Sequence, residues 1–228
     1  MSVAIISEEI LNNIADAIRE KTNTSYKYTP SQMAATLNNL DNVDLAAIIN
    51  GDFNPERIII PGVEHVQTEA FLSSFIEKAT YLNGAKIIDG LGGSWVKEVS
   101  LPDGCTSIGD YAFSGCRRLA SINLPNTITS IASYGFNGCY ELSMKSLPSE
   151  LEYIGDHAFY GCSKATFRVI PKKVKYIGKQ SFAGCTGLTS IILPEDLPEI
   201  GLMAFYQCYN LTSVTLPKNL TKIDYGLF

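Results

Sequence analysis

Aromatic side chains recur along this chain at intervals of 23 residues, or twice that, and could form a binding surface. A tyrosine ring offers rigid contact area with a polar tip, which suits recognition of a carbohydrate or a protein. The alternative is that the rings only shield the edges of the structure and bind no ligand. The candidates fall into three columns: Tyr111, Tyr134 and His157; Tyr153 and Tyr176; and Tyr160 and Tyr206.

Two cations interrupt a repeat position that is otherwise apolar. Lys145 and Arg168 stand there, and each follows a large apolar residue, Met144 or Phe167. A shift of both segments by one residue would exchange their faces, so that the apolar residues are buried and the cations exposed. Exposed cations would suit an anionic glycan or an acidic protein; the alternative is local repacking without a function. The same position elsewhere holds Ile122, Ile191 and Val214.

The sequence contains no catalytic motif. Neither His65 nor His157 is accompanied by the residue order of a catalytic triad, zinc-ligand spacing or a phosphate loop. The glycine-rich stretch DGLGGSW at 89–95 does not follow the dinucleotide-binding fingerprint. We therefore predict a protein that is not an enzyme and that holds no cofactor and no metal ion.

The candidate residues lie in a region with a strict 23-residue period, from 102 to 228. Such a period is typical of a solenoid, in which each coil packs its apolar side against its neighbours. In the coil at 119–139, we expect a short strand around Ser121–Leu124 and a tight helical turn that carries Phe136. The prediction is an α/β repeat solenoid whose short strands pair in parallel. The period is carried by Phe113, Phe136, Phe159, Phe182, Phe205 and Phe228, and by Pro102, Pro125, Pro148, Pro171, Pro194 and Pro217.

Cysteine keeps the same period. Cysteines in adjacent coils would have parallel Cα–Cβ vectors, which is poor geometry for a disulfide. No C-x-x-C pair indicates a metal site. The sixth cysteine, Cys105, falls in an apolar column. We therefore predict six free, buried thiols, of which the periodic ones are Cys116, Cys139, Cys162, Cys185 and Cys208.

Composition limits the classes of partner. The net charge is −5 and the isoelectric point is about 5.1, which argues against binding to nucleic acid. No apolar run approaches the ~18 residues of a membrane-spanning helix, so no membrane insertion is expected. Residues 1–20 are acidic and amphipathic and lack the pattern of a signal peptide, so synthesis in the cytoplasm without general secretory export is expected.

Residues 1–50 have helical periodicity and are predicted to form an attachment or oligomerisation module. The sequence TPSQ at 29–32 is a capping box with proline at the first helical position. Residues 51–101 are predicted to be degenerate coils that cap the solenoid, and 102–228 its regular part. No polar cap follows Phe228, which predicts that the natural chain continues or that another molecule covers this end.

Three copies of one motif identify a family resemblance. IGDYAFSGC at 108–116, IGDHAFYGC at 154–162 and IGKQSFAGC at 177–185 resemble the BspA-like leucine-rich repeat, and the resemblance covers about residues 56–228. It implies a right-handed solenoid whose family roles are adhesion and the binding of proteins or host surfaces, without catalysis. The expected partner is therefore a host cell-surface glycan or protein.

A second resemblance concerns residues 14–40, IADAIREKTNTSYKYTPSQMAATLNNL. They are similar to a short helical module of phage and prophage structural proteins from Gram-positive hosts. This implies a virion protein (tail fibre, baseplate or head decoration), made in the bacterial host cytoplasm, that binds other virion proteins through residues 1–50. A homo-oligomer, for example a trimer, would be compatible with it. One alternative is a bacterial cell-surface adhesin whose leader and anchor are missing from this sequence, and another is a structural spacer without a ligand.

Overall fold

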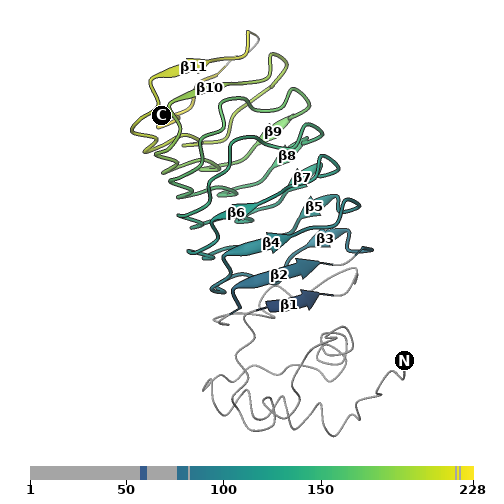
Figure 1. Cartoon of the computed structure of the whole chain (residues 1–228). Coiled ribbons are helices and arrows are strands. Elements are labelled where there is room, and N and C mark those ends of the chain that lie inside the picture. The colour runs from purple at the N-terminus through teal and green to yellow at the C-terminus, as the bar shows by residue number, and fades with distance from the viewer. Residues whose placement is uncertain (1–56, 61–75, 82, 219, 221) are drawn as a thin grey trace, which may run out of the picture.

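The described residues form a parallel β-solenoid, whose coils stack along one axis from β1 to β11 (Figure 1). Among these residues the chain forms strands and turns but no helix. The predicted solenoid is confirmed, whereas the helices predicted within 1–50 lie outside the described residues. The computed structural model describes residues 57–60, 76–81, 83–218, 220 and 222–228.

Three parallel sheets line the coils, and the strands of each sheet come from successive coils. The first sheet contains β1 (Arg57–Ile60), β2 (Lys78–Tyr81), β4 (Glu98–Ser100) and β6 (Ser121–Ile122). The second contains β3 (Ile87–Ile88), β5 (Ser107–Ile108), β7 (Ser130–Ile131), β8 (Tyr153–Ile154) and β9 (Tyr176–Ile177). The third pairs β10 (Ser190–Ile192) with β11 (Ser213–Thr215).

In the regular coils, paired residues are 23 positions apart, as between Ser130 and Tyr153. Neighbouring parallel strands lie ~4.8 Å apart, so the residues of one repeat column stack directly over one another. The earlier coils are shorter, since Lys78 pairs with Glu98, 20 positions on. The interpretation of 51–101 as degenerate capping coils stays a prediction.

The core is built around a column of phenylalanine rings, which we call the inner ladder. Neighbouring rings stack with their centroids 5.1 to 5.5 Å apart and their planes nearly parallel. Burying one such ring contributes about 1.5–3 kcal/mol, so the ladder is a main source of stability. The inner ladder consists of Phe113, Phe136, Phe159, Phe182 and Phe205, all fully buried.

The cysteine column forms hydrogen bonds between coils. The Cys139 thiol donates to the carbonyl oxygen of Phe113 at 3.1 Å, and the same bond recurs at the other periodic cysteines. Burial raises the pKa of Cys116 to about 11, so its thiol stays protonated and can donate at neutral pH. All six cysteines are free and buried, as predicted, and this includes Cys105.

The helical turn predicted around Phe136 is wrong: residues 133–138 form a run of turns. Asn137 N donates to Tyr134 O at 3.1 Å, but Tyr134 itself has a φ of 60°. In this left-handed conformation the N–H of Tyr134 donates to Asp156 O of the next coil at 2.9 Å. A right-handed helix cannot continue through such a residue.

The predicted exchange of faces at the two cations is confirmed. Met144 and Phe167 are buried, with 5% and 0% of their surface exposed, whereas Lys145 and Arg168 are exposed. The physical reason is clearest at Ala165, which is smaller than the leucine at the same position of other coils. The Phe167 ring fills this space and lies 5.6 to 6.0 Å from two rings of the inner ladder.

The two coils are offset by one position where the faces exchange: Thr166 N donates to Met144 O, 22 positions back, whereas Ser143 N donates to Ala120 O, 23 positions back. The regular register returns at Val169, which pairs with Ile192, 23 positions on. In addition, neither 143–147 nor 166–168 adopts strand conformation. The sheet that contains β6 therefore stops before these two coils, and the β10–β11 sheet begins after them.

Candidate binding surfaces

Tyr111, Tyr134 and His157 form a stacked column on the outside of the solenoid, which we call the outer ladder. The ring centroids are 4.6 Å apart between the two tyrosines and 4.7 Å apart between Tyr134 and His157. Each residue follows a strand of the second sheet, β5, β7 or β8, at the same distance along the chain. The regular pairing of these strands therefore brings the three rings into one column.

The turn that carries the outer ladder does not require an aromatic residue. The three ladder residues have φ values between 54° and 60°, which is unfavourable for non-glycine residues. Hydrogen bonds between coils offset this cost, for example from Tyr111 N to Ser133 O at 3.0 Å. Gln180 and Met203 hold the same conformation in later coils, with φ values of 50° and 57°. The turn therefore forms with or without an aromatic ring at this position.

The second column, Tyr153 and Tyr176, adjoins the outer ladder at Asp156. The two rings stack with centroids 4.9 Å apart, and Tyr176 Oη donates to Asp156 Oδ1 at 3.4 Å. Burial, with a contribution from the Asp156 carboxylate, raises the pKa of both tyrosines. Partial burial lowers the pKa of His157, and Asp156 acts in the opposite direction. One carboxylate therefore influences both columns.

The third column is divided between two places. The Tyr160 ring leans against His157 with centroids 5.7 Å apart and the planes tilted by 50°. Tyr206 is exposed but has no ring contact within the described residues. The coil between them has Ala183 at this position. The structure thus brings Tyr160 to the outer ladder and leaves Tyr206 apart.

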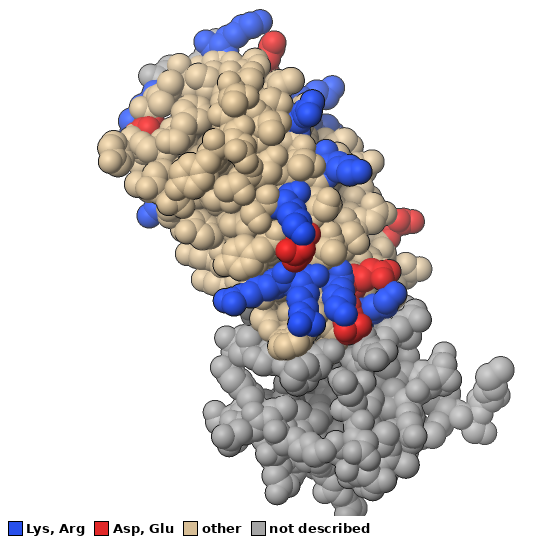
Figure 2. All heavy atoms as spheres, turned by 60° about the vertical axis from the view of Figure 1, so that its left-hand side comes forward, with Lys and Arg blue, Asp and Glu red and all other residues tan. Residues whose placement is uncertain are grey.

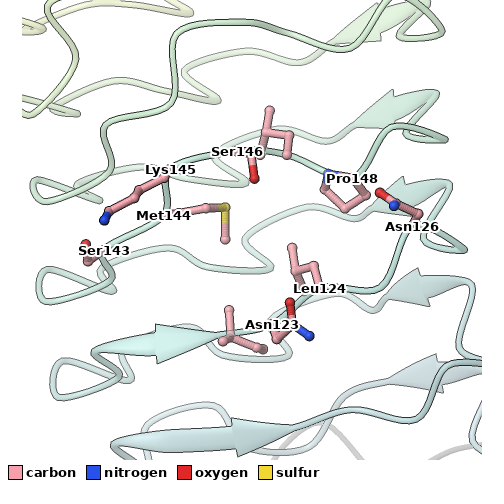
Figure 3. A pocket seen from close by; sticks show the side chains of 10 residues that line it. Asn123, Leu124, Asn126, Ser143, Met144, Lys145, Ser146 and Pro148 are labelled. Carbon is pink, nitrogen blue, oxygen red and sulfur yellow. The ribbon is translucent and has the colours of Figure 1, made fainter.

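Lys145 and Arg168 lie on a different side of the coils, where the sheet is interrupted. Figure 3 shows the first of two hollows there, with the side chains of Met144 and Leu124 inside it. Its volume is about 240 Å³. A second hollow of about 600 Å³ is lined by both cations and by Lys172. The cations therefore border hollows and do not stand on a flat sheet.

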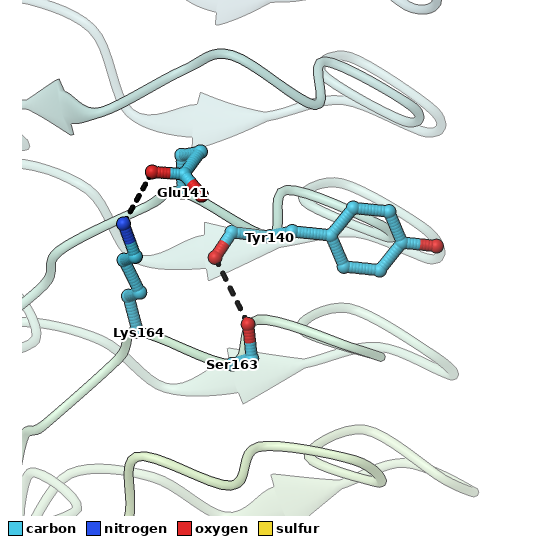
Figure 4. A network of polar contacts seen from close by, with 4 residues as sticks. All are labelled: Tyr140, Glu141, Ser163 and Lys164. Carbon is cyan, nitrogen blue, oxygen red and sulfur yellow. Dashed lines mark hydrogen bonds and ion pairs between the residues drawn. The ribbon is translucent and has the colours of Figure 1, made fainter.

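Elsewhere on the surface, lysines pair with acids of the adjacent coil. Lys164 pairs with Glu141, beside a hydrogen bond that Ser163 Oγ donates to Tyr140 O at 3.0 Å (Figure 4). Figure 2 shows that Lys and Arg gather along one edge of the face it presents, while a broad area of that face carries no charge. Exposed pairs of this kind contribute only about 0–1 kcal/mol each, but they neutralise the cations that take part.

The cations of the interrupted sheet differ from these. Within the described residues, Lys145, Arg168 and Lys172 have no ion pair. Two exposed apolar side chains, Val169 and Ile192, lie beside them. Sequence reasoning missed Lys172, Val169 and Ile192; the available signal was that Val169 and Ile192 share a repeat column with the polar residues Asn123, Ser146 and Thr215.

Two kinds of feature are absent from the part of the chain that the structure describes. No three His, Cys, Asp or Glu side chains gather there in a way that could hold a metal ion. No helix among the described residues has the length and hydropathy that a membrane crossing requires.

Comparison with protein families finds a leucine-rich repeat family. The model of the BspA type leucine-rich repeat region matches residues 93–167 and 154–228, in six copies. No match is found among curated proteins. The matches indicate no enzyme family.

The solved structures that resemble the solenoid include two other leucine-rich repeat proteins. A leucine-rich repeat protein of T. pallidum is 28% identical with a TM-score of 0.58, and the alignment covers 72% of this chain and 76% of that protein. A leucine-rich repeat protein of Bacteroides ovatus is 29% identical with a TM-score of 0.57. That alignment covers 64% of this chain but only 38% of the other protein.

Proposed function

Because the chain belongs to the BspA-type leucine-rich repeat family, we propose that it is a non-enzymatic binding protein that recognises a cell-surface protein through the outer ladder. The observation that carries the proposal is the aromatic identity of Tyr111, Tyr134 and His157. The same turn is built with Gln180 and Met203 in later coils, so backbone geometry does not explain the rings. Proteins of this repeat class generally bind other proteins, which supports the assignment.

The stacking geometry favours a protein over a glycan. In the outer ladder each ring covers the face of its neighbour, with centroids 4.6 to 4.7 Å apart. A sugar ring that packs on an aromatic residue needs an open face, and the stack leaves mainly ring edges and hydroxyl groups. Edges, hydroxyl groups and the nearby Asp156 carboxylate match the mixed apolar and polar surface of a folded protein.

The first experiment measures binding of the fluorescently labelled full chain to a panel of intact Gram-positive bacteria. The test variant carries Tyr111→Gln, Tyr134→Gln and His157→Gln, which reproduces the side chain of Gln180 in the same conformation. The control carries Tyr209→Gln and Tyr225→Gln, two exposed tyrosines outside the ladder. We expect saturable binding to some strains, lost in the test variant and retained in the control. Equal binding by both variants would contradict the proposal.

The location of the protein is a separate hypothesis. The virion hypothesis depends on residues 14–40, which lie outside the described residues, and neither structural relative reported above is named as a phage protein. The cell-surface adhesin is compatible with the repeat family. Mass spectrometry of particles and of cell envelopes from a producing strain separates the two hypotheses, because the full chain should be enriched in only one of them.

The spacer hypothesis predicts no ligand for any surface. A spacer would tolerate substitution of Tyr134, Tyr176, Lys145 and Arg168 without loss of function. It would also show no saturable binding to any strain in the first experiment. Either saturable binding or a loss of function in these variants would exclude it.

A further inference from the structure

We propose that the interrupted side of the solenoid is a second binding site, which takes an extended, acidic peptide segment of a partner protein. The site, which we call the basic strand face, comprises Lys145, Arg168, Lys172, Val169 and Ile192, together with the backbone of 145–147. It lies on the side of β6 and β10, whereas the outer ladder follows the strands of the second sheet. The proposal is therefore independent of the one made for the outer ladder.

The first argument is the unpaired backbone of Lys145–Leu147. Before this segment, Ser143 N donates to Ala120 O at 2.9 Å, as expected between coils. Within the described residues, the backbone groups of Lys145, Ser146 and Leu147 make no hydrogen bond to either neighbouring coil. All three residues line both hollows. A peptide segment that enters the hollows could form hydrogen bonds with such free N–H and C=O groups.

The second argument is charge. Three cations line or border the second hollow, and no acidic residue is among those that line it. The acids that flank Lys145 along the chain are already paired, Glu141 with Lys164 and Glu150 with Lys173. The cations of the basic strand face thus remain available to carboxylates of a partner, and such complementarity favours an acidic segment.

The third argument is the apolar character of the same surface, which favours a peptide over an anionic glycan. The side chains of Val169 and Ile192 are 53% and 48% exposed, and they lie side by side in paired coils. The same column holds polar Asn123, Ser146 and Thr215 in other coils, so the fold does not require apolar residues there. A peptide that alternates acidic and apolar side chains would satisfy both the cations and this apolar pair.

The test uses the full chain and a labelled synthetic peptide in which glutamate and leucine alternate. We expect saturable binding that becomes about tenfold weaker in a Lys145→Glu/Arg168→Glu variant, since two exposed charge pairs are lost. Binding should also weaken as salt is added. The matched control is Lys175→Glu/Lys179→Glu, two exposed lysines without an ion pair in the described residues, located beside β9. The control should bind the peptide like the parent protein.

A second variant tests the apolar contribution. Val169→Thr/Ile192→Thr copies the residue found at Thr215 and should fold normally, because both side chains are exposed. We expect several-fold weaker binding of the glutamate–leucine peptide and no change for a glutamate–glycine peptide. The outer-ladder variant should bind both peptides like the parent protein, which separates this proposal from the proposed function.

Three results would overturn the proposal. The first is no saturable binding of the glutamate–leucine peptide by the parent protein. The second is equal binding by the parent protein and the Lys145→Glu/Arg168→Glu variant. The third is tighter binding of heparin oligosaccharides than of the peptide, lost in the same variant, which would assign the site to an anionic glycan.

Discussion

The solenoid carries two aromatic ladders of the same period, one inside and one outside. Phe113 of the inner ladder and Tyr111 of the outer ladder are only two positions apart, and both ladders stack with nearly parallel planes. The inner ladder is unbroken from Phe113 to Phe205, whereas the outer ladder ends at His157 and is followed by Gln180. Stacking geometry alone therefore does not identify a structural role. Burial identifies a structural role, because only the buried ring recurs from coil to coil without interruption.

The largest expected effect comes from breaking the inner ladder. Phe159→Ala removes a fully buried ring that stacks between Phe136 and Phe182. We expect the free energy of unfolding to fall by about 3–5 kcal/mol, from lost burial and from the cavity left behind. Chemical denaturation measures this. Phe228→Ala is the control, since that ring is 50% exposed; an equal loss in both variants would contradict the role given to burial.

Both ladders depend on the spacing between coils, which a substitution at a closely packed glycine should change. A Cβ atom at Gly178 would lie 2.5 Å from Asp156 N, which is backbone of the preceding coil. Gly178→Ala must push the coils apart, and we expect a loss of about 1–3 kcal/mol in the free energy of unfolding. Gly104→Ala is the control, because its nearest neighbour is the flexible end of Lys86 at 3.7 Å. A stable Gly178→Ala protein would mean that the coil spacing is not rigid.

The sequence predicts the inner features of the fold well, because they repeat. The period alone predicts the solenoid, the buried phenylalanines and the free cysteines. The exchange of faces at Met144 and Phe167 is also predictable, since an apolar residue and a cation swap places in a known column.

The remaining features depend on hydrogen bonds between coils, which cannot be read from the residue types of a repeat column. The left-handed conformation of Tyr134 arises from a hydrogen bond to the next coil, and the usual signal for it, glycine or asparagine, is absent. The hollows arise because the backbone of 145–147 loses its partners in both directions. The sequence marks the cations there but not the missing hydrogen bonds.

A smaller effect is expected when the outer ladder is broken. Tyr134→Gln removes two stacking contacts at the surface and keeps a side chain that the turn accepts, as Gln180 does. We expect a loss of about 0.5–1.5 kcal/mol in the free energy of unfolding, measured by the same denaturation experiment. A loss as large as that of Phe159→Ala would make the outer ladder a structural element and remove the main support for the proposed function.

The smallest expected effect is a pH dependence specific to the outer ladder. Partial burial between Tyr134 and Tyr160 lowers the pKa of His157 below its ordinary value, despite the opposing Asp156 carboxylate. The unfolded chain, with a histidine pKa of about 6.5, then binds a proton at higher pH than the folded chain does. The stability from neutral His157 is therefore complete above about pH 6.5 and is lost as the pH falls through the lower pKa of the folded state.

Comparison of the parent protein with His157→Gln between about pH 7 and pH 5 isolates this effect from other titrating groups. We expect the difference in the free energy of unfolding between the two proteins to shrink on acidification. A difference that grows instead would mean that Asp156 outweighs burial and that a charged imidazolium is held in the stack. The outer ladder would then present a positive charge to its partner, and acidic surfaces would become the preferred targets of the ladder as well as of the basic strand face.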